Sequence, residues 1–258
     1  MDITTHTIFE ANTKGRDYFV GDIHGRYTML IHTLRQMRFD TSKDRLFAVG
    51  DLIDRGDENI ECVALLDEPW FFSSFGNHEE LFLNAMRNPE NSHFVSLHVR
   101  NGGYWAWEKD PSKEIGVSPT DEALELVDSI ATKCPLMMTV KTKQGRIGVV
   151  HADCPKVWPD AADTVKFDKR MIWNREKPEE VAALRNTARP YVVHGIDAVI
   201  HGHERHPDIL RNANRMWIDT ATFGDFTILP SGEVMDCVRE QLANEAQRLS
   251  NSNNPGMG

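Results

Sequence analysis

The sequence predicts an α/β (α+β) fold, a two-sheet β-sandwich flanked by helices. In the first third of the chain, short apolar runs alternate with segments of helical periodicity, which is the pattern of βαβ units and a parallel sheet. The last third carries several short strand candidates with little helix between most of them, which indicates a second sheet packed on the first. The chain has 258 residues, close to the upper size of a single core, so one domain is expected.

The first third contains the same alternation three times, and three strands joined by helices make a βαβαβ core. Each apolar run ends in a glycine and polar residues, and a segment with apolar residues at helical spacing follows. In the first unit the apolar run is Tyr18–Val20, the loop Gly21–Gly25 and the helical segment Met29–Met37. In the second unit they are Leu46–Val49, Gly50–Gly56 and Ile60–Leu66. In the third unit they are Trp70–Phe75, Gly76–Glu79 and Leu81–Met86.

The rest of the chain gives fewer signals. A turn is predicted at 101–103 and a helix over Asp121–Ser129, while Trp105 and Trp107 are expected in the core or in a pocket wall. From about Gln241 the chain becomes rich in Ser and Asn, so we expect one domain over residues 1–240 and a flexible tail over 241–258. Strands of the second sheet are expected at Arg146–Val150, Ala198–Ile200, Met216–Ile218 and Phe226–Leu229.

Composition and charge exclude several classes of protein. Hydrophobic residues make up 40% of the chain and charged residues 26%, values of an ordinary folded domain rather than of a disordered or fibrous chain. The formal charge of -10 disfavours binding to duplex nucleic acid. No secretion signal or membrane-spanning stretch is recognisable, and the four cysteines without a Cys-x-x-Cys pair are interpreted as reduced thiols. We therefore expect a cytoplasmic protein with neither nucleic acid nor membrane as partner.

Side chains that can bind metal follow five of the expected strands, at the end of an α/β sheet where such proteins bind ligands. They combine carboxylate, amide and imidazole groups without thiolate, a set that suits Mn, Fe or Zn. Six ligands are too many for one tetrahedral ion and suit two ions that share Asp51, which lies in the most central loop. A pair of ions indicates hydrolysis of a phosphate ester or a similar bond. The six are Asp22, His24, Asp51, Asn77, His151 and His203.

Four further residues supply groups that phosphate chemistry needs besides metal. Arg55 lies in the second glycine-closed loop and Arg175 is a second cation; two guanidinium groups can hold phosphate oxygens in a bidentate way. His78 directly follows Asn77 and is a candidate general acid, with Asp54 holding its other ring nitrogen.

Three motifs occur in order along the chain: Gly-Asp-Ile-His-Gly at 21–25, Gly-Asp-Leu-Ile-Asp-Arg-Gly at 50–56 and Gly-Asn-His-Glu at 76–79. Together they resemble the signature of the phosphoprotein phosphatase superfamily of calcineurin-like metallophosphoesterases. The resemblance covers roughly Tyr18 to Leu229. Further segments are similar to the bacterial and phage branch typified by the bacteriophage lambda serine/threonine protein phosphatase: 58–62, 101–105, 150–153, 172–176, 202–203 and 217–220.

The resemblance implies a metallophosphoesterase catalytic domain with two divalent ions, usually manganese, with iron or zinc as alternatives. A metal-bridging hydroxide would attack phosphorus directly, and His78 paired with Asp54 would protonate the leaving alkoxide. Arg55, Arg175 and Asn77 would bind the phosphate. By position, Asp22, His24 and Asp51 would hold one ion, and Asp51, Asn77, His151 and His203 the other.

Two positions depart from the common pattern of that family. Glu204 follows His203 where threonine is common, and Ala221 stands where glycine is common. Neither change removes a ligand, but the first adds negative charge and the second restricts the backbone, so both bear on substrate preference. His201 is interpreted as packing or as support for a ligand. The other histidines are expected on the surface or in loops: His6, His32, His93, His98, His194 and His206.

The expected function is that of a metal-dependent serine/threonine protein phosphatase, with some activity on phosphotyrosine and aryl phosphates. Its partners would be phosphorylated proteins or peptides. The alternative is a diadenosine tetraphosphate hydrolase, since that family shares the three loop motifs and the metal centre. A third interpretation, a binding module without activity, is disfavoured by the intact site residues. The sequence leaves open the physiological substrate, the metal used in the cell, the oligomeric state and whether a phage encodes the protein.

Overall fold

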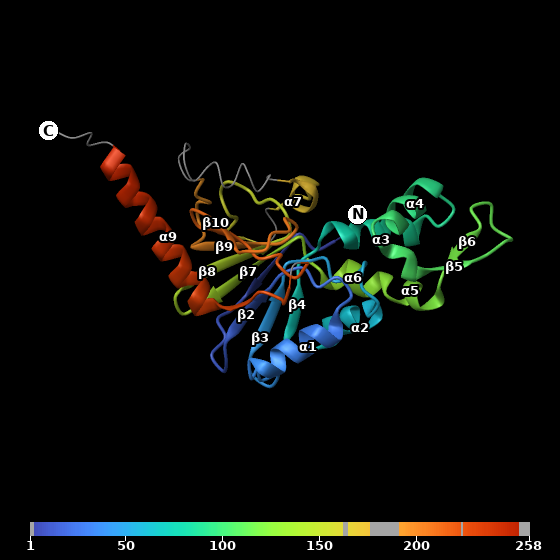
Figure 1. Ribbon diagram of the computed structural model, residues 1–258, viewed down its shortest axis with the longest axis horizontal. Helices are drawn as coiled ribbons and strands as arrows, with labels where there is room; N and C mark the ends of the chain where they lie inside the picture. Colours follow the sequence, from blue (N-terminus) through green and yellow to red (C-terminus); the bar gives the residue numbers. More distant parts are fainter. Residues whose placement is uncertain (1–2, 162–164, 176–190, 223, 253–258) are drawn as a thin grey trace.

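The structure of the protein is a computed structural model that describes residues 3–161, 165–175, 191–222 and 224–252. Two sheets lie against each other at its centre, and helices surround them (Figure 1). Across the smaller sheet the strands are β12 (Ile228–Pro230), β2 (Asp17–Val20), β3 (Arg45–Ala48) and β4 (Phe71–Ser73). Across the larger sheet they are β1 (His6–Phe9), β7 (Met137–Thr142), β8 (Gly145–Val150), β9 (Ala198–His201), β11 (Arg215–Trp217) and β10 (Leu210–Asn212).

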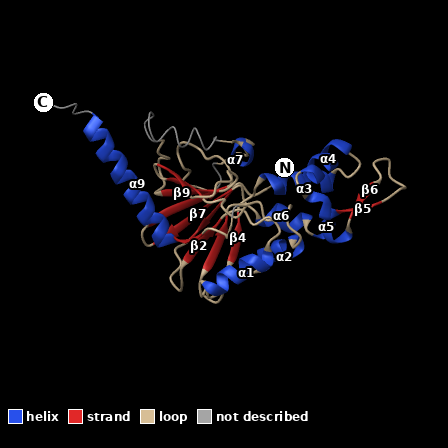
Figure 2. Ribbon diagram, viewed as in Figure 1, coloured by secondary structure: helices blue, strands red, loops and turns tan. Residues whose placement is uncertain are grey.

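The helices fall into three groups. The first follows β2 and β3 and consists of α1 (Tyr27–Gln36), α2 (Asn59–Ala64) and the short 3₁₀ turn η1 (Leu65–Asp67). The second, which we call the helical region, covers residues 77–133 and projects to one side of the sheets (Figure 2). It consists of α3 (Asn77–Arg87), α4 (Ser92–Arg100), η2 (Gly103–Ala106), the hairpin of β5 (Trp107–Lys109) and β6 (Val117–Pro119), α5 (Asp121–Glu125) and α6 (Val127–Lys133). The last group is α7 (Arg170–Trp173) and α9 (Ser231–Ser252).

The smaller sheet is covered on both faces. Strands β2, β3 and β4 run parallel, and β12 pairs with β2 in the antiparallel sense. Side chains alternate between the faces, so Tyr18 and Leu46 pack in the cluster that contains residues of α1 and α2, whereas Phe19 and Phe47 face the larger sheet. Burial on both faces explains why these strands are continuous apolar runs in the sequence.

Aromatic residues of the smaller sheet fill the layer between the two sheets. Phe47 is fully buried, and its ring centroid lies 5.7 Å from that of Phe19 and 5.2 Å from that of Phe72. The larger sheet contributes Met138, Val140, Ile147, Val149 and Ile200 to the same cluster. The prediction of a second sheet packed on the first is therefore confirmed. The strand expected in that second sheet at Phe226–Leu229 instead joins the smaller sheet, as β12 beside β2.

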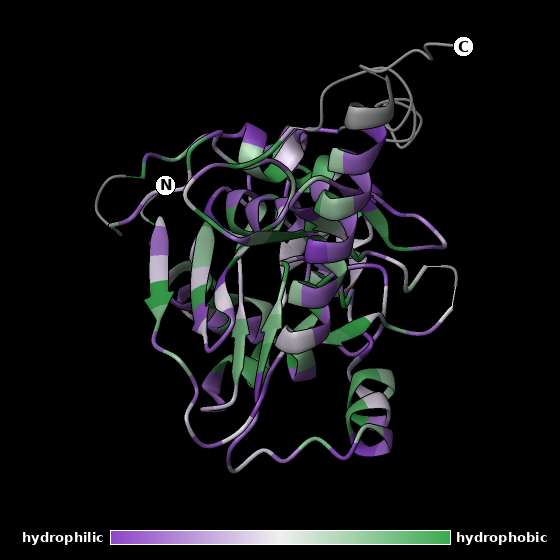
Figure 3. Ribbon diagram, turned by 90° about the vertical axis from the view of Figure 1, so that its left-hand side faces the viewer, coloured by the Kyte–Doolittle hydropathy of each residue, from purple (hydrophilic) through white to green (hydrophobic). Residues whose placement is uncertain are grey.

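Residues 241–252, which were expected to form a tail, continue the helix α9 to Ser252. Val234, Met235 and Val238 of this helix are buried in the cluster between the sheets, and Leu242 packs against it. Apolar and polar residues alternate along α9 (Figure 3). No helix of the described residues is both long and apolar enough to cross a membrane. Residues 253–258 lie outside the described residues.

The first strand of the larger sheet was not expected from the polar N-terminal sequence. β1 pairs in parallel with β7, and His6 at its start is buried rather than on the surface. Its Nε2 atom lies 2.8 Å from the Thr139 hydroxyl. A buried imidazole with a hydrogen-bond partner can occupy a sheet position that composition alone assigns to the surface.

We predict that Phe47→Ala lowers the free energy of unfolding by about 3–5 kcal/mol, since it leaves a cavity between the sheets. Ile60→Ala is the control, because Ile60 is 44% exposed and should change stability by less than about 0.5 kcal/mol. Urea unfolding followed by tryptophan fluorescence measures both. Equal effects of the two substitutions would contradict the central position of Phe47.

Candidate active site

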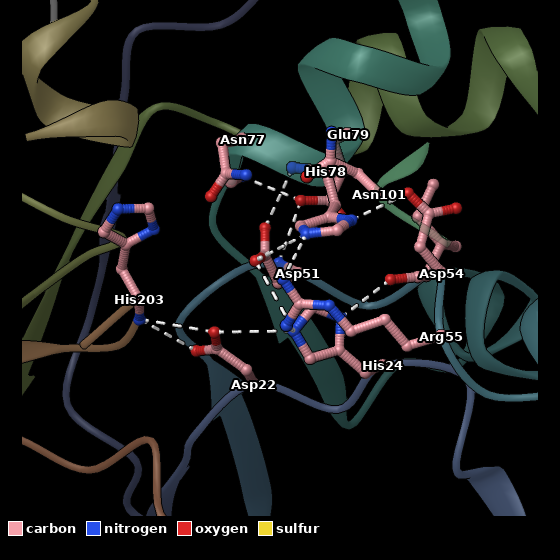
Figure 4. A network of polar contacts seen from close by, with 12 residues as sticks. Asp22, His24, Asp51, Asp54, Arg55, Asn77, His78, Glu79, Asn101 and His203 are labelled. Atoms are coloured by element: carbon pink, nitrogen blue, oxygen red, sulfur yellow. Dashed lines mark hydrogen bonds and ion pairs between the residues drawn. The ribbon is translucent and has the colours of Figure 1, made fainter. Parts of the chain in front are cut away.

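Five strand ends meet at one edge of the two sheets, and the loops that leave them carry the candidate site (Figure 4). Contacts between loops of the two sheets include one of 2.9 Å from His151 Nδ1 to the Val49 carbonyl and one of 3.2 Å from the His203 backbone N–H to Asp22 Oδ1. Figure 4 shows His203 on one side of Asp51 and His24 on the other. The six predicted ligands, all buried, come together at this edge: Asp22, His24, Asp51, Asn77, His151 and His203.

A first group of donor atoms comes from His24, Asp51 and His78, whose ligand atoms lie within 4.8 Å of one another. His24 Nε2 is 3.7 Å from Asp51 Oδ2 and 3.8 Å from Asp22 Oδ2. His78 Nε2 is 3.8 Å from Asp51 Oδ2. Two imidazoles and two carboxylates therefore face a common space on this side of the site.

A second group comes from Asp51, His151 and His203, again with ligand atoms within 4.8 Å of one another. His151 Nε2 lies 3.0 Å from Asn77 Oδ1, 3.1 Å from His203 Nδ1 and 3.4 Å from Asp51 Oδ1. Asp51 belongs to both groups, one carboxylate oxygen facing each. This is the arrangement expected if one carboxylate is shared by two ions.

Backbone carbonyls fix the orientation of two of the imidazoles. His24 Nδ1 lies 3.0 Å from the Ile53 carbonyl, and His151 Nδ1 contacts the Val49 carbonyl. Because a carbonyl only accepts hydrogen bonds, each Nδ1 carries the proton and each Nε2 presents its lone pair to the site. A neutral imidazole in this tautomer is the form that binds a metal ion.

The electrostatics of the site also fit divalent cations. Burial lowers the pKa of His24 to about 3 and that of His203 to about 2, so both imidazoles are neutral near pH 7. Burial and the neighbouring carboxylates of Asp219 and Asp51 raise the pKa of Asp22 well above its usual range. Three carboxylates crowded in a buried space repel one another unless a cation lies between them. Of the two His203 ring nitrogens, Nδ1 faces His151 Nε2 in the second donor group, whereas the buried Nε2 has no hydrogen-bond partner among the described residues.

Glu79 is a residue of the site whose role was not expected. Its carboxylate accepts hydrogen bonds from the backbone N–H groups of Asp51 at 2.9 Å, Leu52 at 2.8 Å and Gly76 at 2.8 Å. Burial and the nearby Asp51 carboxylate raise the pKa of Glu79 to about 7. A glutamate three residues after Gly76, at the start of α3, is a capping-box signal that could have indicated the last of these contacts.

His78, a member of the first donor group, forms a buried pair with Asp54. His78 Nδ1 lies 2.7 Å from Asp54 Oδ2, and neither residue is exposed. Burial alone would lower the pKa of His78, but the Asp51 and Asp54 carboxylates outweigh it and the pKa is raised. Burial would raise the pKa of Asp54, but hydrogen bonds from His78 and His98 hold it at about 2. An ionised Asp54 thus orients His78, whose Nε2 faces the site.

The two arginines lie in different surroundings. Arg55 Nη2 is 2.8 Å from His78 Nε2, and Arg55 Nη1 contacts His24 Nε2. Arg175 is more exposed, and its guanidinium lies 3.8 Å from the buried carboxylate of Glu204. The departure at position 204 therefore places an acid against a cation that was expected to bind phosphate.

The structure also tests the histidines assigned to other roles. His201 lies outside both donor groups. Its ring stacks on Trp217 with 4.9 Å between the ring centroids, and its Nδ1 contacts the Ala152 carbonyl. The interpretation of His201 as a packing residue is therefore confirmed. The surface position expected for His98 is wrong. His98 is fully buried, and its Nε2 lies 3.1 Å from Asp54 Oδ1.

Comparison with known proteins gives the family. The sequence pattern of the calcineurin-like phosphoesterases matches residues 18–207. The chain is a calcineurin-like phosphoesterase. This phosphoesterase is 34% identical over 226 residues to serine/threonine-protein phosphatase 2 of Salmonella typhimurium, and the match covers 86% of this chain and 95% of the relative. The recognised superfamily is therefore confirmed.

Two further similarities are to proteins named for dinucleotide hydrolysis. The phosphoesterase is 26% identical over 163 residues to a symmetrical bis(5'-nucleosyl)-tetraphosphatase of Shewanella sp. (strain W3-18-1), covering 63% of this chain and 53% of the relative. A crystal structure assigned provisionally as a diadenosine tetraphosphatase superposes with a TM-score of 0.59 at 22% identity, covering 88% of this chain and 95% of that chain. The superposition confirms the predicted fold class.

We predict that each buried neutral histidine of the metal-free phosphoesterase contributes stability that is lost as the pH falls below about 6.5. Burial lowers the pKa of His24 and His201 to about 3 and that of His203 to about 2, whereas the unfolded chain titrates these histidines near 6.5. At these three positions the unfolded state binds more protons, so the stability that they contribute above pH 6.5 is lost progressively toward pH 3. The raised pKa values of Asp22 and Glu79 act in the opposite sense, so the comparison of variants isolates the histidine contribution. The expected slope is on the order of 1 kcal/mol per pH unit for each such histidine.

Urea unfolding of metal-stripped protein at pH 7.5 and 5.5 measures this loss. His201→Gln should reduce the slope, while His32→Gln, at an exposed position, should leave it unchanged. A pH slope of the His201 variant equal to that of the unmodified protein would contradict a buried neutral histidine at this position.

Proposed function

We propose that this phosphoesterase is a metal-dependent serine/threonine protein phosphatase that hydrolyses phosphomonoesters of phosphorylated proteins or peptides in the cytoplasm. The buried His78–Asp54 pair beside the two donor groups carries the proposal. A serine or threonine alkoxide is a poor leaving group and needs a proton donor, which this pair can supply. The match along 95% of a serine/threonine-protein phosphatase, against 53% of the tetraphosphatase, supports the same substrate class.

The donor set suits two divalent ions, for which we propose manganese, with iron and zinc as the alternatives. When bound, two such ions would supply Lewis-acid charge toward the phosphate oxygens and promote the ionisation of water. Asp22, His24 and Asp51 would hold one ion, and Asp51, Asn77, His151 and His203 the other.

Three residues would bind the phosphate group. Arg55 and Arg175 offer guanidinium donors to the non-bridging oxygens. The substrate phosphate would take the Arg55 donors that now face His24 and His78. Asn77 directs its Oδ1 toward His151, which leaves its amide nitrogen for a phosphate oxygen.

His78 would act as the general acid. Asp54 Oδ2 accepts the hydrogen bond from His78 Nδ1, so the transferable proton is the one at Nε2. The raised pKa of His78, due to the carboxylates of Asp51 and Asp54, favours the protonated imidazole. This proton passes from Nε2 to the leaving serine or threonine oxygen as the ester bond breaks.

We predict that metal-stripped protein is inactive and that added Mn²⁺ restores hydrolysis of a phosphoserine peptide and of p-nitrophenyl phosphate. Phosphate release measures both, with diadenosine tetraphosphate assayed in parallel. Cleavage of the dinucleotide alone would replace the proposal by the tetraphosphatase function. No hydrolysis of any of the three with Mn²⁺, Fe²⁺ or Zn²⁺ would indicate a binding module instead.

We predict that His78→Asn lowers kcat on the phosphoserine peptide by about 10²- to 10⁴-fold, the usual contribution of a general acid. The metal content, measured by elemental analysis, should not change, since the six proposed ligands remain. His93→Asn is the matched control, because His93 is exposed on α4. Loss of bound metal in the His78 variant would contradict the acid role and point to a ligand.

A further inference from the structure

We propose that His98, Trp105 and Trp107 are positioning residues that hold the carboxylate of Asp54, so that His78 presents Nε2 to the leaving oxygen. The inference rests on the acid role proposed above for His78. It assigns a purpose to α4 and to the Asn-Gly-Gly-Tyr-Trp segment at 101–105, which the chemistry described so far does not use.

Both oxygens of the Asp54 carboxylate are occupied by ring donors. Oδ2 accepts from His78 Nδ1 at 2.7 Å, whereas Oδ1 accepts from Trp105 Nε1 at 2.8 Å and from His98 Nε2 at 3.1 Å. Asp54, His78 and His98 have no exposed surface. The carboxylate therefore cannot rotate without losing hydrogen bonds in a place where water does not replace them.

Trp107 fixes the proton of His98. Its indole Nε1 lies 3.1 Å from His98 Nδ1, and an indole N–H can only donate. Nδ1 of His98 is therefore the acceptor, and the proton of the neutral ring lies on Nε2, where it is donated to Asp54 Oδ1. A chain of hydrogen bonds thus runs from Trp107 through His98 and Asp54 to His78.

The rings of this chain are held by tight packing. Trp105 stacks on the buried Phe82 with centroids 5.7 Å apart and an interplanar angle of 7°, and the His98 ring packs against the same phenyl group at an interplanar angle of 73°. The His98 imidazole also lies directly against Gly103, where any Cβ would overlap it. Glycine at 103 is thus needed for His98 to reach Asp54.

The same segment contacts the loop that carries the arginine of the site. The Arg55 backbone N–H donates to the Gly102 carbonyl at 3.2 Å, and Gly102 has a φ of 105°, which favours glycine. Residues 102–107 and α4 therefore form one support for the Asp54–Arg55 turn. Because the donors of the metal groups come from the strand loops, loss of this support should affect proton transfer more than metal binding.

The leaving group of the substrate distinguishes positioning from general stability. A p-nitrophenolate departs readily without a proton, whereas a serine alkoxide does not. If His98 positions the acid, His98→Leu should lower kcat on a phosphoserine peptide by about 10- to 100-fold, a part of the 10²- to 10⁴-fold effect of a general acid. On p-nitrophenyl phosphate kcat should fall by less than about 3-fold on the same reasoning.

Matched variants, all assayed with Mn²⁺, extend this test. Trp107→Phe keeps the ring but removes the donor, so it should lower kcat on the phosphopeptide in the same selective way but by less. His98→Gln restores a side-chain N–H donor and should recover part of the loss. His93→Leu changes an exposed histidine of the same helix and should change neither substrate. Trp105→Phe tests the second donor on Oδ1 if His98→Leu does not fold.

The outcomes separate the inference from the function on which it rests. Three results for the His98 and Trp105 variants would overturn the positioning role: an equal fall of kcat on both substrates, a change in KM alone, or no change. Activity of the wild-type protein on phosphomonoesters would still uphold the phosphatase function in each case. A wild-type protein that cleaves no phosphomonoester would refute the proposed function itself. Selective loss on the phosphopeptide with unchanged metal content is the result we expect.

Discussion

The geometry of the site depends on one buried carboxylate, that of Glu79, which accepts three backbone hydrogen bonds from two separate loops. The contact joins the turn after β3 to the start of α3. Asp51 lies in that turn, and its two oxygens face the two donor groups. Removal of Glu79 would leave three buried N–H groups without acceptors, each at a cost of roughly 1–3 kcal/mol. A shift of this turn would displace both proposed metal positions together.

The site loops also hold backbone strain that the surrounding fold offsets. In the described parts of the chain, five of the seven non-glycine residues with positive φ belong to the site: His24, Asp51, Asp54, Arg55 and His203. Such a conformation costs about 1–2 kcal/mol for an L residue. Hydrogen bonds stabilise several of these positions; the Asp54 backbone N–H, for example, donates to Asn59 Oδ1 at 2.7 Å. The side chains are therefore aimed by the backbone rather than by flexible rotamers.

Whether the sequence predicts a feature of the fold or of the site depends on how far apart along the chain the interacting residues lie. The proposed ligands are recognisable because each follows an apolar run, and parallel strands bring their carboxyl ends to one edge. The role of His98 is not recognisable from the sequence, because its helix carries no motif and its partner Asp54 lies 44 residues away along the chain. The helical end of α9 was missed for a related reason. Glu245, in the part expected to be a tail, accepts a hydrogen bond from the Ala213 backbone at 3.2 Å, a contact between distant segments that local composition does not show.

The two kinds of chemistry at the site come from different parts of the fold. The loops that leave the strands, together with Asn77 at the start of α3, supply the metal donors, and their position is set by strand pairing and by the aromatic layer around Phe47. The helical region supplies the contacts to Asp54, on which the orientation of His78 depends. Because α4 and residues 101–107 contribute none of the six proposed ligands, changes there can alter proton delivery without removing a metal donor. A substitution in α4 or in residues 101–107 would then alter which leaving groups the site accepts. The geometry that binds the phosphate group would stay the same.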